Sequence, residues 1–211
     1  MTITWFGQSC FRLEAKEGSI LIDPFSKEIG LKPPRIKDDV VLVTHQHHDH
    51  NNIADANPEA FIIQNPGEYE NHGIAIQGIQ SFHDSKEGTE RGLNTIYVIK
   101  AEELTICHLG DLGHLLTDHQ VEQIGDVDIL MIPVGDTYTI GAKTAVEVIS
   151  QVEPKIVIPM HYKVAASTSK VLEGPEKFVK ELGLTPEKFD KYKITKKLLP
   201  AEEIKLVMFE M

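Results

Sequence analysis

The sequence has few cysteines and no long apolar segment. Cys10 and Cys107 fall within predicted strands, neither at the spacing of a metal ligand, so we expect buried, reduced thiols and no disulfide framework. The longest apolar runs, such as residues 129–134, are far too short to span a bilayer. The N-terminal residues lack the basic and apolar regions of a secretory signal. We therefore expect a cytoplasmic protein without membrane insertion.

Positive charge is also scarce, because 21 Lys and Arg residues stand against 32 Asp and Glu residues, for a formal net charge of −11. Nucleic-acid backbones need a basic surface, so this balance disfavours nucleic acid as the main partner and favours a small-molecule substrate. Apolar residues make up 41% of the chain and charged residues 25%, as in ordinary globular proteins. The 211 residues fit one domain, residues 1–211, and homo-oligomer formation stays open.

Short strands dominate the first half of the chain. Apolar patterns predict strands at residues 3–6, 11–14, 19–23, 40–44, 60–64, 74–82, 95–100 and 104–109. In the second half, the patterns predict helices at 117–124, 142–152 and 175–182, and strands at 129–134, 156–159 and 204–209. This order favours an α/β fold, with two sheets packed face to face and helices outside in a four-layer sandwich.

Histidine, in contrast, is abundant, and its ten residues are unevenly spread. Four candidate metal ligands, His45, His47, Asp49 and His50, lie within six residues directly after the predicted strand 40–44. In an extended or turning segment, the first two can project to one side and the last two can reach a neighbouring position. Imidazole and carboxylate groups suit Zn²⁺ and similar metals. The alternative, a solvated histidine-rich loop, is disfavoured because the cluster directly follows a core strand.

Further candidate ligands lie at the ends of later predicted strands. His83 follows strand 74–82, Asp111 follows the strand that ends at 109, and His161 comes just after the strand that begins at 156. Any one of them alone would more often be an ordinary loop residue. Their common position after strands, together with the histidine cluster, predicts one metal site assembled from several strand ends.

Five ordered segments resemble the motifs of the metallo-β-lactamase superfamily, namely residues 20–24, 45–50, 81–84, 108–111 and 159–162. The opening residues 5–9 are similar to the first strand and turn of the same group. Among its branches, the chain is most similar to small hydrolases related to ascorbate-6-phosphate lactonase and to N-acylphosphatidylethanolamine phospholipase D. The resemblance implies the αββα fold of that superfamily, with two facing mixed β-sheets and helices outside.

The same resemblance implies two divalent metal ions, which we expect to be zinc, with manganese or iron as alternatives. It assigns His45, His47 and His83 to the first metal, assigns Asp49, His50 and His161 to the second, and makes Asp111 the bridge. Two further residues are expected near the metals without binding them. Asp23 would orient ligands, although an ordinary Asp-Pro turn is the alternative. His108 would pack in the core or behind the ligands, with a substrate contact as the alternative.

Several departures narrow the branch. No cysteine stands at a ligand position and a bridging aspartate is present, which disfavours β-lactam hydrolysis. His47 rather than glutamate in the motif argues against the di-iron redox branch. The chain is too short for the added domain of the RNA-processing members, and it lacks the helical domain of glyoxalase II. The phospholipase D relatives are considerably longer, so cleavage of membrane lipids does not transfer.

We expect a metal-bridging hydroxide to attack an ester, lactone or phosphodiester bond of a small substrate, with Asp49 and Asp111 positioning it. Tyr138 or Thr139, in the loop 135–141, would contact the substrate, and Lys163 would attract an anionic group. The alternative for that loop is an ordinary turn. The charged loop 84–92 is either a rim of the site or a plain surface hairpin. A non-catalytic metal-binding protein of the same fold and a nucleotide or nucleic-acid phosphodiesterase remain alternative functions.

Overall fold

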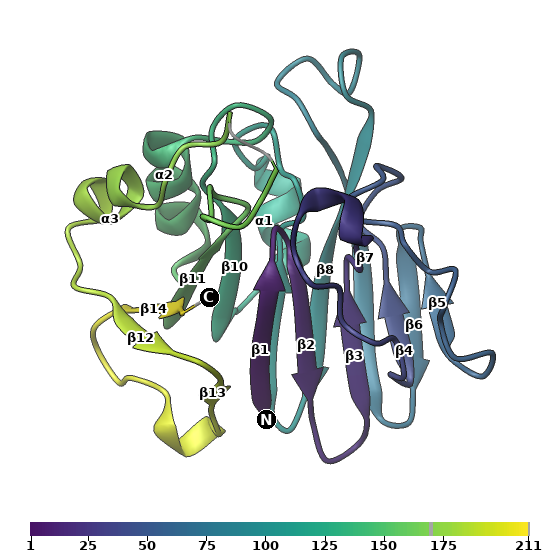
Figure 1. The fold of residues 1–211 in the computed structure, drawn as a ribbon. Coiled ribbons are helices and arrows are strands. Elements are labelled where there is room, and N and C mark those ends of the chain that lie inside the picture. The colour runs from purple at the N-terminus through teal and green to yellow at the C-terminus, as the bar shows by residue number, and fades with distance from the viewer. Residues whose placement is uncertain (169–170, 211) are drawn as a thin grey trace.

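Two mixed β-sheets packed face to face form the centre of the computed structural model, which describes residues 1–168 and 171–210 (Figure 1). The first sheet has six strands, in the spatial order β13 (Tyr192–Lys193), β1 (Thr2–Gly7), β2 (Cys10–Glu14), β3 (Ser19–Ile22), β4 (Val40–Leu42) and β5 (Phe61–Ile63). The second has eight, in the order β12 (Glu187–Phe189), β14 (Lys205–Phe209), β11 (Ile156–Met160), β10 (Ile129–Pro133), β9 (Leu104–His108), β8 (Leu93–Ala101), β7 (Ile74–Phe82) and β6 (Gly67–Asn71).

Three α-helices from the second half of the chain lie on the side of the eight-stranded sheet (Figure 1): α1 (Asp118–Ile124), α2 (Ala142–Val152) and α3 (Glu176–Leu182). Helix α1 begins after Thr117, whose side chain accepts a hydrogen bond from the backbone N–H of Gln120 in a capping box. Helix α2 buries Ala145, Val148 and Ile149, whose spacing puts them on one helical face. A short 3₁₀ helix, η2 (Lys196–Leu198), lies between β13 and β14.

The outer face of the six-stranded sheet has a different cover. Cys10, Leu21 and Val41 point away from the other sheet and pack against Phe25 and Ile29 in a separate apolar cluster. These last two residues belong to the segment after β3, which contains the 3₁₀ helix η1 (Lys27–Ile29). The two facing mixed sheets of the expected fold are confirmed. Among the described residues, the α-helical layer is developed on one sheet, whereas a loop with one 3₁₀ turn covers the other.

The main apolar cluster joins the inner faces of both sheets. Phe11, Ile20 and Leu42 enter it from the first sheet, and Ile96 and Ile106 enter it from the second. Burying a side chain of this size stabilises a fold by about 1.5–3 kcal/mol, so the shared cluster is what keeps the sheets together. This core is therefore common to both halves of the chain.

The strand directions bring many strand ends to one edge of the sandwich. Strands β3, β4 and β5 are mutually parallel, as are β9, β10 and β11. Strand β7 runs in the direction of β9 because each is antiparallel to β8. The carboxyl ends of parallel strands meet at the same edge of a sheet, where α/β proteins place their sites.

The strands and helices predicted from the sequence are confirmed, with small shifts of their ends. The sequence patterns missed β6, β12 and β13. Strand β6 is a mostly exposed edge strand without apolar alternation, and the other two are very short, so neither type leaves a periodic signal. Both cysteines are free and buried. In the described part of the chain, no helix has the length and apolar character needed to cross a membrane.

Candidate metal centre

The seven expected ligands converge at the edge where the parallel strands end. His45, His83, Asp111 and His161 follow the carboxyl ends of β4, β7, β9 and β11 respectively. The ligand atoms of His45, His47 and His83 lie within 4.8 Å of one another, and so do those of Asp49, His50 and His161. The two groups that the resemblance implied are thus each brought together, and Asp23, His45 and His50 form a third group of neighbouring ligand atoms.

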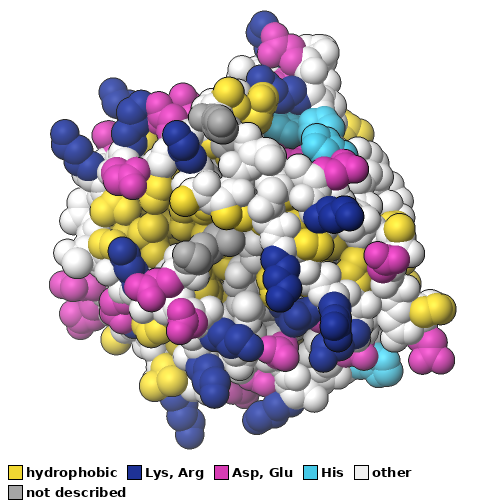
Figure 2. Space-filling model, viewed as in Figure 1, with side chains coloured by type: hydrophobic (Ala, Val, Ile, Leu, Met, Phe, Trp, Pro, Cys, Tyr) yellow, Lys and Arg dark blue, Asp and Glu magenta, His cyan; other side chains and the backbone are white. Residues whose placement is uncertain are grey.

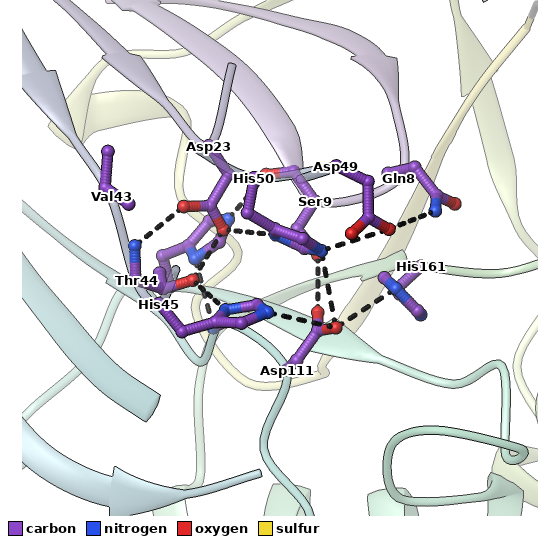
Figure 3. Close-up of polar contacts among 12 residues, drawn as sticks. Gln8, Ser9, Asp23, Val43, Thr44, His45, Asp49, His50, Asp111 and His161 are labelled. Atoms are coloured by element: carbon purple, nitrogen blue, oxygen red, sulfur yellow. Dashed lines mark hydrogen bonds and ion pairs between the residues drawn. The ribbon is translucent and has the colours of Figure 1, made fainter. Parts of the chain in front are cut away.

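Asp111 contacts members of both groups, and Figure 3 shows it facing His45 of the first group and His161 of the second. Its Oδ2 atom faces four imidazole Nε2 atoms, at 3.1 Å from His161, 3.2 Å from His83, 3.4 Å from His50 and 3.9 Å from His45. Burial alone would raise the pKa of Asp111, but the nearby His161 and His50 outweigh it and hold the pKa well below its usual range. An ionised carboxylate thus stands where it can contact both groups.

The ring of His45 is oriented by a hydroxyl group. The Thr44 hydroxyl donates to Oδ2 of Asp23 at 2.7 Å, and it therefore accepts from Nδ1 of His45, which lies 2.9 Å away. This tautomer leaves the Nε2 lone pair of His45 free to bind a cation. Burial lowers the pKa of His45 to about 2, so the ring is neutral at physiological pH.

Asp23 also orients His50. Its Oδ2 atom lies 3.0 Å from Nδ1 of His50, and its Oδ1 atom accepts the backbone N–H of Thr44 at 2.8 Å. These hydrogen bonds engage both oxygens of Asp23, as expected for a residue that orients ligands without binding metal. Burial would lower the pKa of His50, but Asp111 and Asp23 outweigh it and raise the pKa. The same carboxylates favour a metal cation beside Nε2.

Unpartnered nitrogen atoms test whether this site fits a metal. Buried polar atoms in proteins nearly always have hydrogen-bond partners. Within the described residues, the buried Nε2 atoms of His45 and His50 have no hydrogen-bond partner, and both face Oδ2 of Asp111. The site combines such nitrogens with ionised carboxylates and contains no thiolate. This donor set fits divalent metal ions of the zinc and manganese type.

Asp49 is held by a residue that the sequence analysis did not single out. Nε2 of Gln8 donates to Oδ2 of Asp49 at 3.0 Å, and the backbone oxygen of Gln8 accepts the N–H of His161 at 3.0 Å. Burial would raise the pKa of Asp49, but a hydrogen bond and the charge of His50 outweigh it and lower the pKa. Gln8 thus links two candidate ligands of the same group.

Asp111 has supports of its own that were also missed. Ser9 donates its hydroxyl to Oδ1 of Asp111 at 3.0 Å, and Oδ1 of Asn94 accepts the backbone N–H of Asp111 at 2.9 Å. The only hint in the sequence was that Gln8 and Ser9 lie in the opening turn that resembles the family. Asn94 gave no local signal, because its role depends on contact between β8 and the loop after β9.

His108 lies behind the site. The N–H of Gly110 donates to Nδ1 of His108 at 3.1 Å, so Nε2 carries the hydrogen and donates to the backbone oxygen of Ser9 at 2.9 Å. Its ring packs edge-on against the ring of Phe11, with 5.9 Å between the ring centroids. With both nitrogens engaged, His108 is placed as the expected support residue, because it positions the Ser9 turn against Asp111.

The backbone at the site adopts unusual conformations. Gln8, Asp23 and His161 have φ values of 48°, 47° and 51°, in the left-handed region that non-glycine residues seldom occupy. Such residues each cost on the order of 1 kcal/mol and cluster at functional sites. Gly135 permits the close approach of the His161 segment, since a Cβ atom there would lie 2.0 Å from the His161 backbone oxygen.

A cavity of about 420 Å³ opens beside the site. Its lining consists of Gln8, Ile29, His47, His48, Asp49, His83, Arg91, Asp111, Tyr138, His161 and Thr168. Exposed histidine side chains appear at the upper right of the molecule, below the loop that joins β7 to β8 (Figure 2; Figure 1 for the loop). Candidate ligands from both groups therefore face a space that a substrate can enter.

Of the three residues expected to contact the substrate, the structure brings one to the cavity and leaves two away from its lining. Tyr138 lines the cavity, but Thr139 is buried and its hydroxyl donates to the backbone oxygen of Ile140 at 3.2 Å. Lys163 is exposed and does not line the cavity. The neighbouring Tyr162 packs on Trp5, with 5.0 Å between ring centroids, which leaves Lys163 to face solvent. Among the described residues of the lining, Arg91 from the loop 84–92 supplies the Lys or Arg charge instead.

Comparison with known proteins agrees with this geometry. The model of the beta-lactamase superfamily domain matches residues 2–161. A UPF0173 metal-dependent hydrolase of Pyrococcus abyssi is 30% identical over 236 residues, which cover 97% of this chain and 99% of that protein. A crystal structure from Thermotoga maritima, assigned to the Zn-dependent hydrolases of the metallo-β-lactamase superfamily, has a TM-score of 0.82 and 38% identity, and covers 99% of this chain and 97% of its own.

A more distant structure shares the fold alone. The isothiocyanate hydrolase from Delia radicum gut bacteria has a TM-score of 0.71 at 17% identity, covering 92% of this chain and 99% of its own. The family model spans most of the chain, and the candidate ligands stand in the expected order at the ends of strands. The chain therefore belongs to the metallo-β-lactamase superfamily of metal-dependent hydrolases.

Proposed function

We propose that the protein is a dinuclear metal-dependent hydrolase that cleaves an ester, lactone or phosphodiester bond of a small substrate. The observation that carries this proposal is the position of Asp111, whose Oδ2 atom faces imidazoles of both ligand groups. A single metal would need only one of these groups. The UPF0173 relatives, which are metal-dependent hydrolases, support the same reaction class.

In this proposal, His45, His47 and His83 hold one metal ion, and Asp49, His50 and His161 hold the other, with Asp111 shared between them. Bound there, two divalent cations would supply a water of lowered pKa as the nucleophile and a Lewis acid for the substrate oxygen. We choose zinc, with manganese or iron as alternatives, because nitrogen and oxygen ligands without thiolate discriminate weakly among these metals.

The side chains around the metals position the reacting groups. Gln8 holds the Asp49 carboxylate and Ser9 holds that of Asp111, so that each presents an oxygen toward the cavity side of the site. We assign to these two carboxylates the orientation of the attacking water and the removal of its proton. Tyr138 stands at the cavity as a donor to the substrate.

A small substrate suits the size of the cavity, since about 420 Å³ lies near the lower end of the range for small-molecule sites. We place the reaction in the cytoplasm, in keeping with two free, buried cysteines. A non-catalytic metal-binding role has less support, because a shared carboxylate serves no evident purpose without a reaction between two metals. A nucleotide phosphodiesterase would use the same residues.

Metal content tests the dinuclear site. Protein purified without chelator and then incubated with zinc should contain close to two metal ions per chain by elemental analysis. Asp111→Ala should lose at least one ion and most of the hydrolytic activity, because it removes the shared ligand. The control His119→Ala, at an exposed position on α1, should change neither. A zinc content near zero in the parent protein would overturn the proposal.

A substrate panel then identifies the scissile bond. We expect turnover of a lactone, an ester or a small phosphodiester to fall little with added salt, because coordination at the metals is screened less than surface attraction. Lys and Arg side chains do appear on the lower part of one face, interspersed with acidic residues (Figure 2). Oligonucleotides therefore belong in the panel. Efficient and steeply salt-sensitive cleavage of long oligonucleotides would instead identify a nuclease.

A further inference from the structure

One carboxylate organises the loop between β7 and β8. Oδ1 of Asp84 accepts the backbone N–H groups of Lys86 at 2.7 Å and Gly88 at 3.0 Å, and its Oδ2 accepts those of Glu90 at 3.0 Å and Arg91 at 2.7 Å. The Asp84 residue is only 4% exposed. The loop projects from the sheets near the site (Figure 1). Four donors on one buried carboxylate hold the loop in a defined shape and fix the position of the Arg91 backbone.

The Arg91 side chain extends from this loop to the cavity. Its guanidinium carbon lies 5.5 Å from the centre of the Tyr138 ring, and its Nη2 donates to the backbone oxygen of Thr137 at 3.3 Å. These contacts join the loop before β8 to the loop after β10. A guanidinium over an aromatic ring is held in place while its edge stays free.

No carboxylate neutralises Arg91 among the described residues. Arg12 shows the opposite situation, because its Nε and Nη2 atoms lie 2.7 and 2.8 Å from the two carboxylate oxygens of Asp38. In the loop of Arg91 itself, Lys86 pairs with Glu90 and does not line the cavity. Arg91 therefore faces the cavity with a positive charge and with N–H groups that are available to donate hydrogen bonds.

We infer that Arg91, stacked on Tyr138, binds an anionic group of the substrate, a carboxylate or a phosphate, at the end remote from the scissile bond. A guanidinium presents paired N–H groups that match the two oxygens of such anions. The charge is also distinctive in a chain whose net charge is −11. This inference rests on the proposed function, because the reacting end of the same substrate is placed at the metals.

Hydroxamate ligands test the inference without turnover, since the hydroxamate binds a metal while the chain reaches across the cavity. The monohydroxamates of succinate, glutarate and adipate are compared with alkyl hydroxamates of equal carbon number, and 3-phosphonopropionohydroxamate supplies the phosphate arm. Calorimetry on the zinc-loaded protein gives each Kd. At the chain length that reaches Arg91, the anionic ligand should bind about tenfold more tightly than its alkyl twin. Whichever of the carboxylate and phosphonate ligands has the lower Kd shows which anion Arg91 prefers.

Variants separate direct contact from general electrostatics. Arg91→Gln should abolish the preference for the anionic ligand while leaving the Kd of the alkyl twin unchanged. Arg91→Lys should keep part of the preference, and Tyr138→Phe should keep more of it than Tyr138→Leu. The matched control Lys86→Gln removes a charge from the same loop and should change nothing.

The possible failures are distinguishable. A preference that survives in Arg91→Gln, or the absence of any preference at every chain length, overturns the inference but leaves the metal site intact. If even the alkyl hydroxamates fail to bind the zinc-treated protein, the metal site itself is refuted, and the proposed function and the inference both fall. Elemental analysis of the same samples shows whether zinc was present.

Discussion

Single residues outside the candidate ligand set decide how the ligands are oriented. Asp23 and Thr44 select the tautomers of His50 and His45 through hydrogen bonds of 2.7 to 3.0 Å. Ser9 acts on Asp111 from a position 102 residues away in the sequence. Each of these contacts leaves a lone pair or a carboxylate oxygen directed at the place where a metal would bind.

At the scale of one residue, Ser9→Ala is informative because it removes a single oxygen atom. The Ser9 hydroxyl is fully buried and donates to Oδ1 of Asp111, so the variant leaves that oxygen without its partner. We expect zinc affinity to fall about tenfold with the fold retained. Competition with a chelating dye measures the affinity, and circular dichroism checks the fold.

The control for this variant is Ser150→Ala. Ser150 is an exposed residue of α2, and its hydroxyl donates to the backbone oxygen of Val146 at 3.0 Å rather than to a candidate ligand. The Ser150→Ala variant should bind zinc with the same affinity as the parent protein. Equal zinc affinities for Ser9→Ala and the parent would show that Asp111 does not depend on Ser9.

At the scale of elements, the strand ends at the two edges of the eight-stranded sheet have different roles, one in the candidate metal site and the other in stability. The carboxyl ends of β7, β9 and β11 lead into candidate ligands. At the opposite ends, Asp128 precedes β10 and accepts the backbone N–H of Thr105 in β9 at 3.0 Å. Lys196 of η2 and Lys155 before β11 lie 2.8 and 3.1 Å from the same carboxylate. Asp128 therefore connects four segments where no ligand is expected.

Asp128→Asn should lower the free energy of unfolding by about 1–2 kcal/mol at pH 7, because it removes two ion pairs and weakens the bond to Thr105. Burial would raise the pKa of Asp128, but Lys196, Thr105 and Lys155 outweigh it and lower the pKa. A lowered folded-state pKa stabilises the fold above the unfolded value of about 4, and this contribution is lost as pH falls further.

The difference between the parent and Asp128→Asn should therefore be constant from pH 7 to about pH 5 and should shrink toward pH 3. Urea unfolding at each pH measures it. Asp126→Asn, two residues earlier and exposed, is the control and should show little difference at any pH. A difference that grows as the solution becomes more acidic would contradict the assigned direction of the pKa shift.

At the scale of the whole molecule, the metals would join the two sheets. His45, His47, Asp49 and His50 follow a strand of the six-stranded sheet, whereas His83, Asp111 and His161 follow strands of the eight-stranded sheet. Each ligand group draws on both sheets. Metal binding should therefore stabilise the packing of one sheet on the other as well as the local loops.

Chelation should lower the thermal stability of the whole chain. A site filled at a hundredfold excess over its Kd adds about 3 kcal/mol, which is about 5–10 °C in Tm for a protein of this size. Calorimetry of zinc-loaded and chelator-treated protein measures the shift. Asp111→Asn should lose most of the zinc-dependent shift, and His119→Ala should keep all of it. A Tm that does not respond to zinc would argue against a site that joins the sheets.

Local patterns in the sequence were sufficient for the longer strands and helices and for the candidate ligands, although they missed the edge strand β6 and the short strands β12 and β13. Some predicted features depend only on neighbouring residues, namely strand 40–44, the dense group from His45 to His50 and the position of Asp111 after a strand. The structure contains each of them. Side-chain periodicity and residue chemistry carry this information, because both are set within a few positions of the chain.

Contacts between distant segments were decided only by the tertiary structure. The strand order within the six-stranded sheet brings Gln8 to Asp49, and the packing of the two sheets brings Ser9 to Asp111. The loop around Asp84 directs Arg91 to the cavity. The same packing buries Tyr162 and leaves Lys163 facing solvent. The sequence by itself determined which chemistry was available at the strand ends. Which further residues contact the ligands or line the cavity depends on how distant segments pack, and a local sequence pattern does not contain this information.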